Sequence, residues 1–162
     1  MKKLCLLLMC MLFLSGCAAA ETFETIADVY GEQQVLPPRE VLLEIPEDAA
    51  AQAIKSDDGT LYLCDGYEIT LQTMPAGDLN QTMRSLTGFD SDALTMIETG
   101  LTEAARYECV WTAAGEGGDM IGRAVILDDG AYHYCVTVMA SAKEAGALRE
   151  TWQTLLQSFE LA

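Results

Sequence analysis

The only histidine in the chain and a cysteine two positions after it could together do chemistry, because a histidine can take the proton of a nucleophilic thiol. His133 and Cys135 would share one face of an expected strand. Side chains two residues apart on a strand lie about 7 Å apart, too far for direct proton transfer. We therefore interpret His133 as a residue at the edge of the core with local hydrogen bonds, assign no catalytic residue, and do not expect an enzyme.

Three acidic stretches resemble parts of calcium loops: Asp57-Asp58-Gly59, Asp90-Ser91-Asp92 and Asp128-Asp129-Gly130. An EF-type loop alternates its ligands and ends in Glu at the twelfth position, and none of the three does so. We expect turns or helix caps there. Gly115-Glu116-Gly117-Gly118 joins two expected strands and is a turn rather than a phosphate-binding loop. The sequence thus predicts no metal ion and no cofactor.

A cysteine near the N-terminus follows a short apolar run. Met1-Lys2-Lys3 is a positive start, and Leu4 to Leu14 contains no polar residue, which is the layout of a secretory signal. The run is too short for a membrane span, which needs about 20 apolar residues. Ser15 and Gly16 are small enough for a peptidase site, and Cys17 brings a nucleophilic side chain.

Leu14-Ser15-Gly16-Cys17 resembles the lipobox of bacterial lipoproteins. The resemblance implies that the Cys17 thiol receives a diacylglycerol and that the signal peptide, residues 1–16, is removed. Two or more acyl chains hold a protein stably on a bilayer. We therefore expect Cys17 to be the lipidation site, and the protein to lie on the extracytoplasmic side of the cell membrane without a transmembrane helix.

The chain from Cys17 onward has 146 residues, with seven basic and 25 acidic side chains, a net charge near −18. This charge argues against nucleic acid as a partner and against docking on anionic lipid, because both need clusters of Lys and Arg. The length fits one domain. We expect a lipid-anchored tether at 17–40, ending in Pro37-Pro38, and a single globular domain at 41–162.

Hydrophobic patterns predict an α+β domain. The expected elements are a strand at 41–45, a hairpin at 60–74 around Asp65-Gly66, a helix from Asp78 to Leu86, a strand at 94–99 (a helix being the alternative), strands at 106–114, 120–128 and 131–139, and a helix at 142–158. The last helix is amphipathic, with an apolar stripe formed by Leu148, Trp152, Leu155, Leu156 and Phe159.

The turn lengths predict which residues face one another in the last three strands. A four-residue loop at 115–118 places Cys109 opposite Ala124 and Trp111 opposite Gly122. A two-residue turn at Asp129-Gly130 places Ala124 opposite Cys135 and Val125 opposite Tyr134. Both faces of this sheet are then apolar, so each must be covered. The first face carries Val110, Val125, Leu127, Tyr132, Tyr134, Val136 and Val138, and the second carries Tyr107, Cys109, Trp111, Ile126, Cys135 and Met139.

Three cysteines remain after Cys17. In this register Cys109 and Cys135 lie two strands apart, about 9.6 Å between Cα atoms, which exceeds the roughly 7 Å limit for a disulfide. We expect packed thiols, and any disulfide would have to join Cys64 to Cys109 or Cys135.

A two-sided antiparallel sheet, a late three-strand meander and a terminal helix ending "WQTLLQSFEL" together resemble the PsbP-like and DcrB-like α/β/α sandwich of small bacterial lipoproteins. The resemblance covers about residues 40–161. It implies that fold, and no catalytic residue carries over.

The expected function is that of a membrane-anchored binding or accessory module. It would contact a protein or small ligand through a sheet face, a loop rim or a cleft beside the terminal helix. Tyr132 and Tyr134 would mark a recognition surface if they were exposed. An extracytoplasmic hydrolase that uses paired carboxylates and a structural component of the cell envelope are the alternatives.

Overall fold

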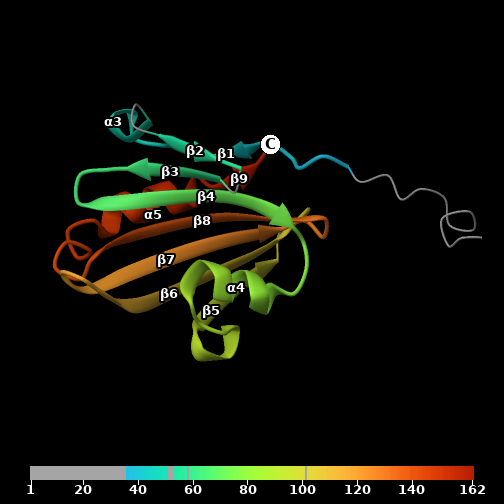
Figure 1. Ribbon diagram of the computed structural model, residues 1–162. Coiled ribbons are helices and arrows are strands. Elements are labelled where there is room, and N and C mark those ends of the chain that lie inside the picture. Colours follow the sequence, from blue (N-terminus) through green and yellow to red (C-terminus); the bar gives the residue numbers. More distant parts are fainter. Residues whose placement is uncertain (1–35, 51–52, 58, 101) are drawn as a thin grey trace, which may run out of the picture. The chain divides into compact units, whose positions relative to one another are not determined.

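The computed structural model of the protein describes residues 36–50, 53–57, 59–100 and 102–162, so Cys17 and the expected signal peptide lie outside the described residues. The described part has an α+β fold built on a seven-stranded antiparallel sheet, in the order β2-β3-β4-β8-β7-β6-β5 (Figure 1). The strands are β2 Ile54–Ser56, β3 Gly59–Leu63, β4 Tyr67–Pro75, β5 Thr95–Gly100, β6 Ala105–Gly115, β7 Gly118–Asp128 and β8 Tyr132–Ser141. The fold class expected from the sequence is confirmed.

A short ribbon and four helical segments complete the described part. Its first and last strands, β1 Val41–Leu42 and β9 Glu160–Leu161, pair with each other. The helices are α3 Glu47–Ala50, α4 Leu79–Thr87, the 3-10 turn η1 Ser91–Ala93 and α5 Arg149–Gln157. None of the described helices is long and apolar enough to cross a bilayer.

Two elements are shorter than expected. The first strand ends at Leu42, because the chain leaves β9 there and runs along α5 instead. The terminal helix begins at Arg149, since residues 142–148 form successive turns, in which the amides of Ala145 and Ala147 bond back to Ser141 and Glu144.

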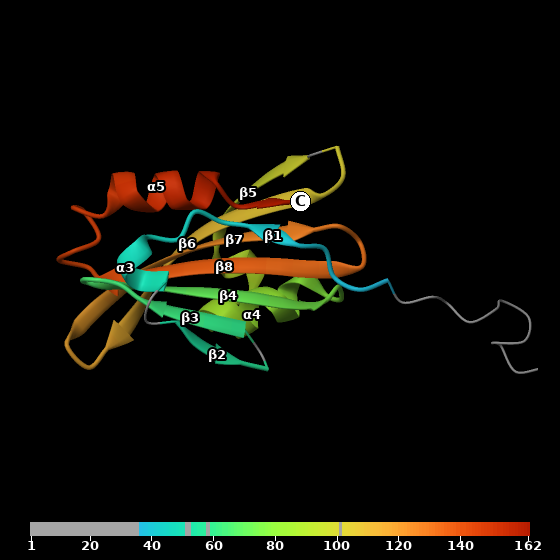
Figure 2. The same ribbon diagram turned by 90° about the horizontal axis from the view of Figure 1, so that it is seen from above.

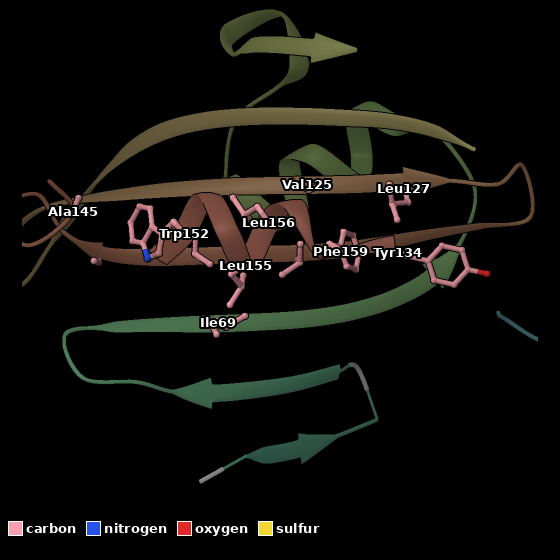
Figure 3. Close-up of a cluster of buried hydrophobic side chains, with 12 residues drawn as sticks. Ile69, Val125, Leu127, Tyr134, Ala145, Trp152, Leu155, Leu156 and Phe159 are labelled. Atoms are coloured by element: carbon pink, nitrogen blue, oxygen red, sulfur yellow. The ribbon is translucent and has the colours of Figure 1, made fainter. Parts of the chain in front are cut away.

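One face of the sheet is covered by α5, whose apolar stripe packs on β4, β7 and β8 (Figure 3). The most buried side chains of this cluster include Trp152, Leu155 and Leu156 from α5, Phe159 just after it, and Ile69, Val125, Tyr134, Val136 and Val138 from the sheet. Trp152 also meets Tyr67, with ring centroids 6.5 Å apart and a tilt of 59°. The stripe expected from the sequence is therefore core.

The opposite face is covered by α4 (Figure 2). Met83 of α4 is fully buried and joins Cys109, Trp111, Ala124, Ile126 and Cys135 of the sheet. Asp78 caps the helix by accepting a hydrogen bond from the amide of Asn80 at 3.0 Å, and Gly88 ends it in a left-handed conformation. The expected sheet with two covered faces is thus present.

The register of the meander is correct on one side and wrong on the other. Cys109 lies opposite Ala124, and Trp111 lies opposite Gly122, as expected. On the other side Val125 lies opposite Val136 and Ala124 opposite Thr137, a shift of two residues from the expected pairing. The reason is the turn at Asp129, whose carboxylate accepts hydrogen bonds from the amides of Ala131 (2.9 Å) and Tyr132 (2.7 Å), so that the connection is longer than two residues.

Candidate functional site

The two tyrosines that would mark a recognition surface if exposed differ in their burial. Tyr134 is completely buried and Tyr132 is half-buried. Both lie at the start of β8 on the face of α5, where the chain entering the domain at Leu36–Leu42 crosses them. The condition of exposure that the sequence analysis set is therefore not met by Tyr134, because its ring belongs to the core.

The hydroxyls of these tyrosines hold the entering chain in place. Tyr134 donates to Asp129 Oδ2 at 2.9 Å and accepts a hydrogen bond from the amide of Arg39 at 2.8 Å. Tyr132 donates to the carbonyl of Leu36 at 2.9 Å. The guanidinium of Arg39 bonds the carbonyl of Ala162 at 2.8 Å. The last residues of the expected tether, from Leu36 onward, are thus bound to the domain.

Asp129 is the acidic residue at the contact between the entering chain and β8. Burial would raise the pKa of its carboxyl, but hydrogen bonds from the amides of Tyr132 and Ala131 and from the Tyr134 hydroxyl, together with the charge of Arg39, outweigh burial and lower the pKa. For Tyr134, burial and the neighbouring Asp129 raise the pKa of the phenol, although the Arg39 amide acts in the opposite direction. The pair is therefore a carboxylate and a neutral phenol at neutral pH.

His133 is fully buried rather than at the edge of the core, and it contacts one residue close in sequence, Asp128, and one distant residue, Thr82. Its Nδ1 lies 2.8 Å from Thr82 Oγ1 on α4, and its Nε2 lies 3.5 Å from Asp128 Oδ2. A hydroxyl, an imidazole and a carboxylate in a row are the residue types of a hydrolase triad. Here Thr82 is 6 % and His133 1 % exposed, and neither lines the groove or hollows that include Glu44 and Leu155, Arg39 and Leu161, Leu63 and Glu144, or Phe89 and Thr112. The Thr82 hydroxyl and the His133 ring are therefore largely shielded from solvent in this arrangement.

The buried cysteines are not poised as nucleophiles. Burial raises the pKa of the Cys135 thiol to about 12. Burial also raises the pKa of Cys109 to about 11, against a weaker opposing effect of a backbone hydrogen bond at Ala124. Both are therefore neutral thiols near neutral pH, and the thiolate is the reactive form. Both are also free, so Cys64 bridges neither of them, which answers the question that the sequence left open.

A groove beside the terminal helix has a volume of about 530 Å³. One wall is the segment from Glu44 to Glu47, and the other is α5. The wall residues on α5 are Glu150, Thr151, Thr154 and Leu155. The amide of Glu44 donates to Ser158 Oγ at 3.0 Å, which fixes the segment against the end of α5.

The groove combines an apolar base with a negative rim. Ile45, Pro46 and Leu155 supply the apolar surface, and Glu44, Glu47 and Glu150 supply exposed carboxylates on both walls. No Lys or Arg lines the groove, and none of these three carboxylates takes part in the ion pairs found in the described part of the chain. Such a surface suits a ligand with a positive charge on an apolar stem.

A metal ion is a poorer fit to the same groove. Within the described residues, no three His, Cys, Asp or Glu side chains are close enough together to hold a metal ion. A divalent cation needs several oxygen ligands within about 2.6 Å, whereas an alkylammonium group can be attracted by carboxylates spread along a groove. The geometry therefore favours an organic cation.

Sequence reasoning anticipated a cleft beside the terminal helix, but of its lining residues it named only Leu155, as part of the apolar stripe of that helix. The available signal was Pro46, which ends the expected first strand between two glutamates. What the sequence could not show is that this segment lies along α5.

No protein-family model matches the sequence, and no curated protein matches it either. Several solved structures are similar in fold. The PsbP protein of the cyanobacterium Synechocystis has a TM-score of 0.49 at 8% identity, over 66% of this chain and 76% of that one. A protein of unknown function from Pseudomonas aeruginosa has a TM-score of 0.48 at 11% identity, over 80% and 88%. LpqN, which is involved in cell envelope biogenesis in Mycobacterium tuberculosis, has a TM-score of 0.47 at 13% identity, over 85% and 97%. No function follows from likeness at this level.

Proposed function

We propose that this chain is an extracytoplasmic lipoprotein, anchored to the cell membrane through a lipid on Cys17, that acts as a binding or accessory module. The motif Leu14-Ser15-Gly16-Cys17 after a short apolar run supports the anchor. The domain that follows, residues 36–162, has 21 acidic and seven basic side chains, so its partner is neither nucleic acid nor an anionic lipid surface.

The groove between the Glu44–Glu47 segment and α5 is the observation that carries the binding role. Its chemistry selects a protonated amine on an alkyl stem, because the stem covers Ile45, Pro46 and Leu155 while the charge meets the glutamates. A lysine side chain of a partner protein and a free alkyl diamine both have this chemistry.

A hydrolase role is not favoured by any described residue set. The trio of Thr82, His133 and Asp128 is largely shielded from solvent, since its hydroxyl and imidazole are buried on the α4 side of the sheet. We therefore propose a non-catalytic role.

Binding is tested by calorimetric titration of the full chain in detergent micelles with 1,5-diaminopentane, with a short acetylated peptide containing one lysine, and with the neutral control 1,5-pentanediol. The two amines should bind and the diol should not. A stronger response to the peptide would indicate a protein partner, and a stronger response to the diamine a small one. Equal binding of the diol would contradict the role of the carboxylates.

Matched variants locate the binding. Replacing Glu44 and Glu150 by Gln should lower the affinity for the amines about fivefold, because each exposed ion pair contributes roughly 0.2–1 kcal/mol. Glu116→Gln lies in the exposed turn between β6 and β7 and serves as the control that leaves affinity unchanged. Unchanged affinity in the double variant would overturn the assignment of the groove.

The anchor is tested separately by mass spectrometry of the membrane fraction. The N-terminal peptide should begin at Cys17 and carry the mass of a diacylglycerol. Cys17→Ser should release the protein from the membrane or leave it unprocessed. An unmodified N-terminus on the wild-type protein would refute the lipoprotein assignment without affecting the groove.

A further inference from the structure

The two edges of the seven-stranded sheet are protected to different degrees. β2 spans the three residues Ile54–Ser56 and carries Lys55, and short strands with lysine are a common protection of sheet edges against pairing. β5 at the other edge spans six residues, Thr95–Gly100, without Lys or Pro. Its pairing with β6 runs unbroken from Thr95 opposite Val110 to Gly100 opposite Ala105, without a bulge.

The backbone groups along the outer edge of β5 are available for hydrogen bonding to a further strand. Among the described strands, β5 has a neighbour on one side only (Figure 2). Every residue of β5 except Met96 is exposed. An antiparallel strand directs the amides and carbonyls of alternate residues away from its neighbour. A regular strand of six residues therefore presents a row of donors and acceptors to a further strand.

The face of β5 on the side of α5 carries one exposed apolar side chain, Ile97, which lies between Thr95 and Thr99 and opposite Glu108 of β6. Ile97 is 63 % exposed, and Val110, on the same face of neighbouring β6, is 51 % exposed. Neither belongs to the core cluster under α5. A hollow of about 310 Å³, lined by residues that include Val110, Thr95 and Phe89, adjoins them at the start of the strand.

The other face of β5 is negative. Glu98 lies opposite Tyr107 of β6. Burial raises the pKa of the Tyr107 phenol, and the negative charges of Glu98 and Asp128 raise it further. Both carboxylates therefore lie close enough to Tyr107 to make this part of the surface negative. Glu98 itself has no basic partner among the ion pairs of the described residues.

We propose that the β5 edge binds an extended segment of a partner polypeptide as an eighth strand of the sheet. Main-chain hydrogen bonds to Thr95–Gly100 give the affinity, as in other cases of strand addition. Alternating side chains give the specificity: apolar residues face Ile97 on the side of α5, and a basic residue stands beside Glu98 on the other side.

A second copy of this chain is a poor occupant of the same edge. Two domains with a net charge of −14 each repel one another, and antiparallel pairing of two β5 strands about their centre brings the two Glu98 side chains opposite or next to each other. The partner is therefore a different, basic segment. This surface is independent of the groove beside α5.

The probe is the acetylated and amidated peptide Lys-Val-Lys-Val-Lys-Val-Lys, in which valines occupy one face and lysines the other. Its affinity is measured by titration of the full chain in detergent micelles, with Glu44→Gln and Glu150→Gln in place so that the groove contributes less, and its position is measured by hydrogen exchange. Binding should slow exchange at 95–100. A peptide of the same sequence with N-methyl groups on alternate residues keeps its charge but loses donors, and should bind at least tenfold more weakly.

Variants separate this edge from the groove. Glu98→Lys, at an exposed position, should lower the affinity for the lysine peptide about tenfold and create binding of the analogue with Glu in place of Lys. Glu150→Gln should leave protection at 95–100 unchanged. Equal binding of the N-methylated peptide, protection confined to β2 or α5, or self-association of the protein through β5 without any peptide would overturn the proposal.

Discussion

The indole ring of Trp111 occupies the space that a side chain on Gly122, directly across on β7, would need. A Cβ built on Gly122 would lie 2.3 Å from Trp111 Cζ2 and 2.4 Å from Cε2, far inside normal contact. Trp111 is 5 % exposed and belongs to the core cluster under α4, so it has little room to move. The two residues therefore act as one packing unit on this face of the sheet.

This unit predicts that Gly122→Ala destabilises the protein by about 1–3 kcal/mol, the usual cost of forcing a methyl group into a filled core. Urea unfolding followed by tryptophan fluorescence measures the loss. Gly146→Ala is the control and should change little, because a Cβ there meets nothing within 4 Å. In a Trp111→Leu background the cost of Gly122→Ala should shrink, and an unchanged cost would refute the steric explanation.

The second prediction concerns Tyr134, whose hydroxyl joins the entering chain to Asp129. Tyr134→Phe removes the donor to Asp129 and the acceptor for the Arg39 amide, and should cost about 1–3 kcal/mol because polar groups at a buried contact lose their partner. Tyr132→Phe should cost less, since its bond to Leu36 is exposed. Limited proteolysis should also reach the chain around Arg39 faster in Tyr134→Phe. Equal stability of the two variants would contradict this ranking.

The third prediction is a pH dependence from Asp129. Its pKa is lowered in the folded protein below 3.8, the ordinary value of an aspartate side chain, so the unfolded state binds the proton more readily. The carboxylate thus contributes stability above about pH 3.8, and this contribution is lost as pH falls through the lower folded pKa. Asp129→Asn should remove this part of the acid-induced loss, as measured by urea unfolding at pH 6, 4 and 3. If the free energy of unfolding falls equally with pH in the wild type and in Asp129→Asn, the prediction is wrong.

The β-meander shows how far the sequence could predict the fold. Apolar alternation predicted which face each residue of β6, β7 and β8 occupies, and the faces are correct because the error in register is an even number of residues. The predicted pairing of β7 with β8 was wrong by two residues, because the turn at Asp129 is longer than expected. The Asp129 carboxylate can cap the amides of Ala131 and Tyr132, and the choice between this turn and a two-residue turn depends on the contact with Tyr134 and Arg39, which are distant in sequence.

The candidate site was predictable only in its general place. A cleft beside the terminal helix was expected, but its second wall comes from residues 44–47, of which 44 and 45 were expected to end a strand. That wall exists because β1 stops at Leu42 and the Glu44 amide bonds Ser158, a contact across more than 100 residues. Local patterns do not encode such a contact. The contact between Thr82 and His133 was not predicted for the same reason, since α4 and β8 meet only in the folded chain.

The fourth prediction is that the two core thiols resist alkylation. With pKa values of about 11 and 12, Cys109 and Cys135 have little thiolate at pH 8, and both are shielded from solvent. Iodoacetamide at pH 8 followed by peptide mass spectrometry should leave both unmodified in the native protein and modify both in 8 M urea. Rapid native labelling of either would show that α4 opens readily.

The last prediction tests what the trio of Thr82, His133 and Asp128 does. Because Asp128 faces Nε2, the proton of a neutral His133 is best placed there, and Nδ1 then accepts a hydrogen bond from the Thr82 hydroxyl, an assignment that rests on the hydrogen-bond geometry. Thr82→Val keeps the shape of the side chain but leaves a buried ring nitrogen without its donor, which should cost about 1–3 kcal/mol. Ser85→Ala on the exposed side of the same helix should cost much less. The ¹⁵N chemical shifts of the imidazole should report the Nε2–H tautomer in the wild type. If they report Nδ1–H, the hydroxyl is the acceptor, and the bond holds α4 to the sheet in the opposite direction.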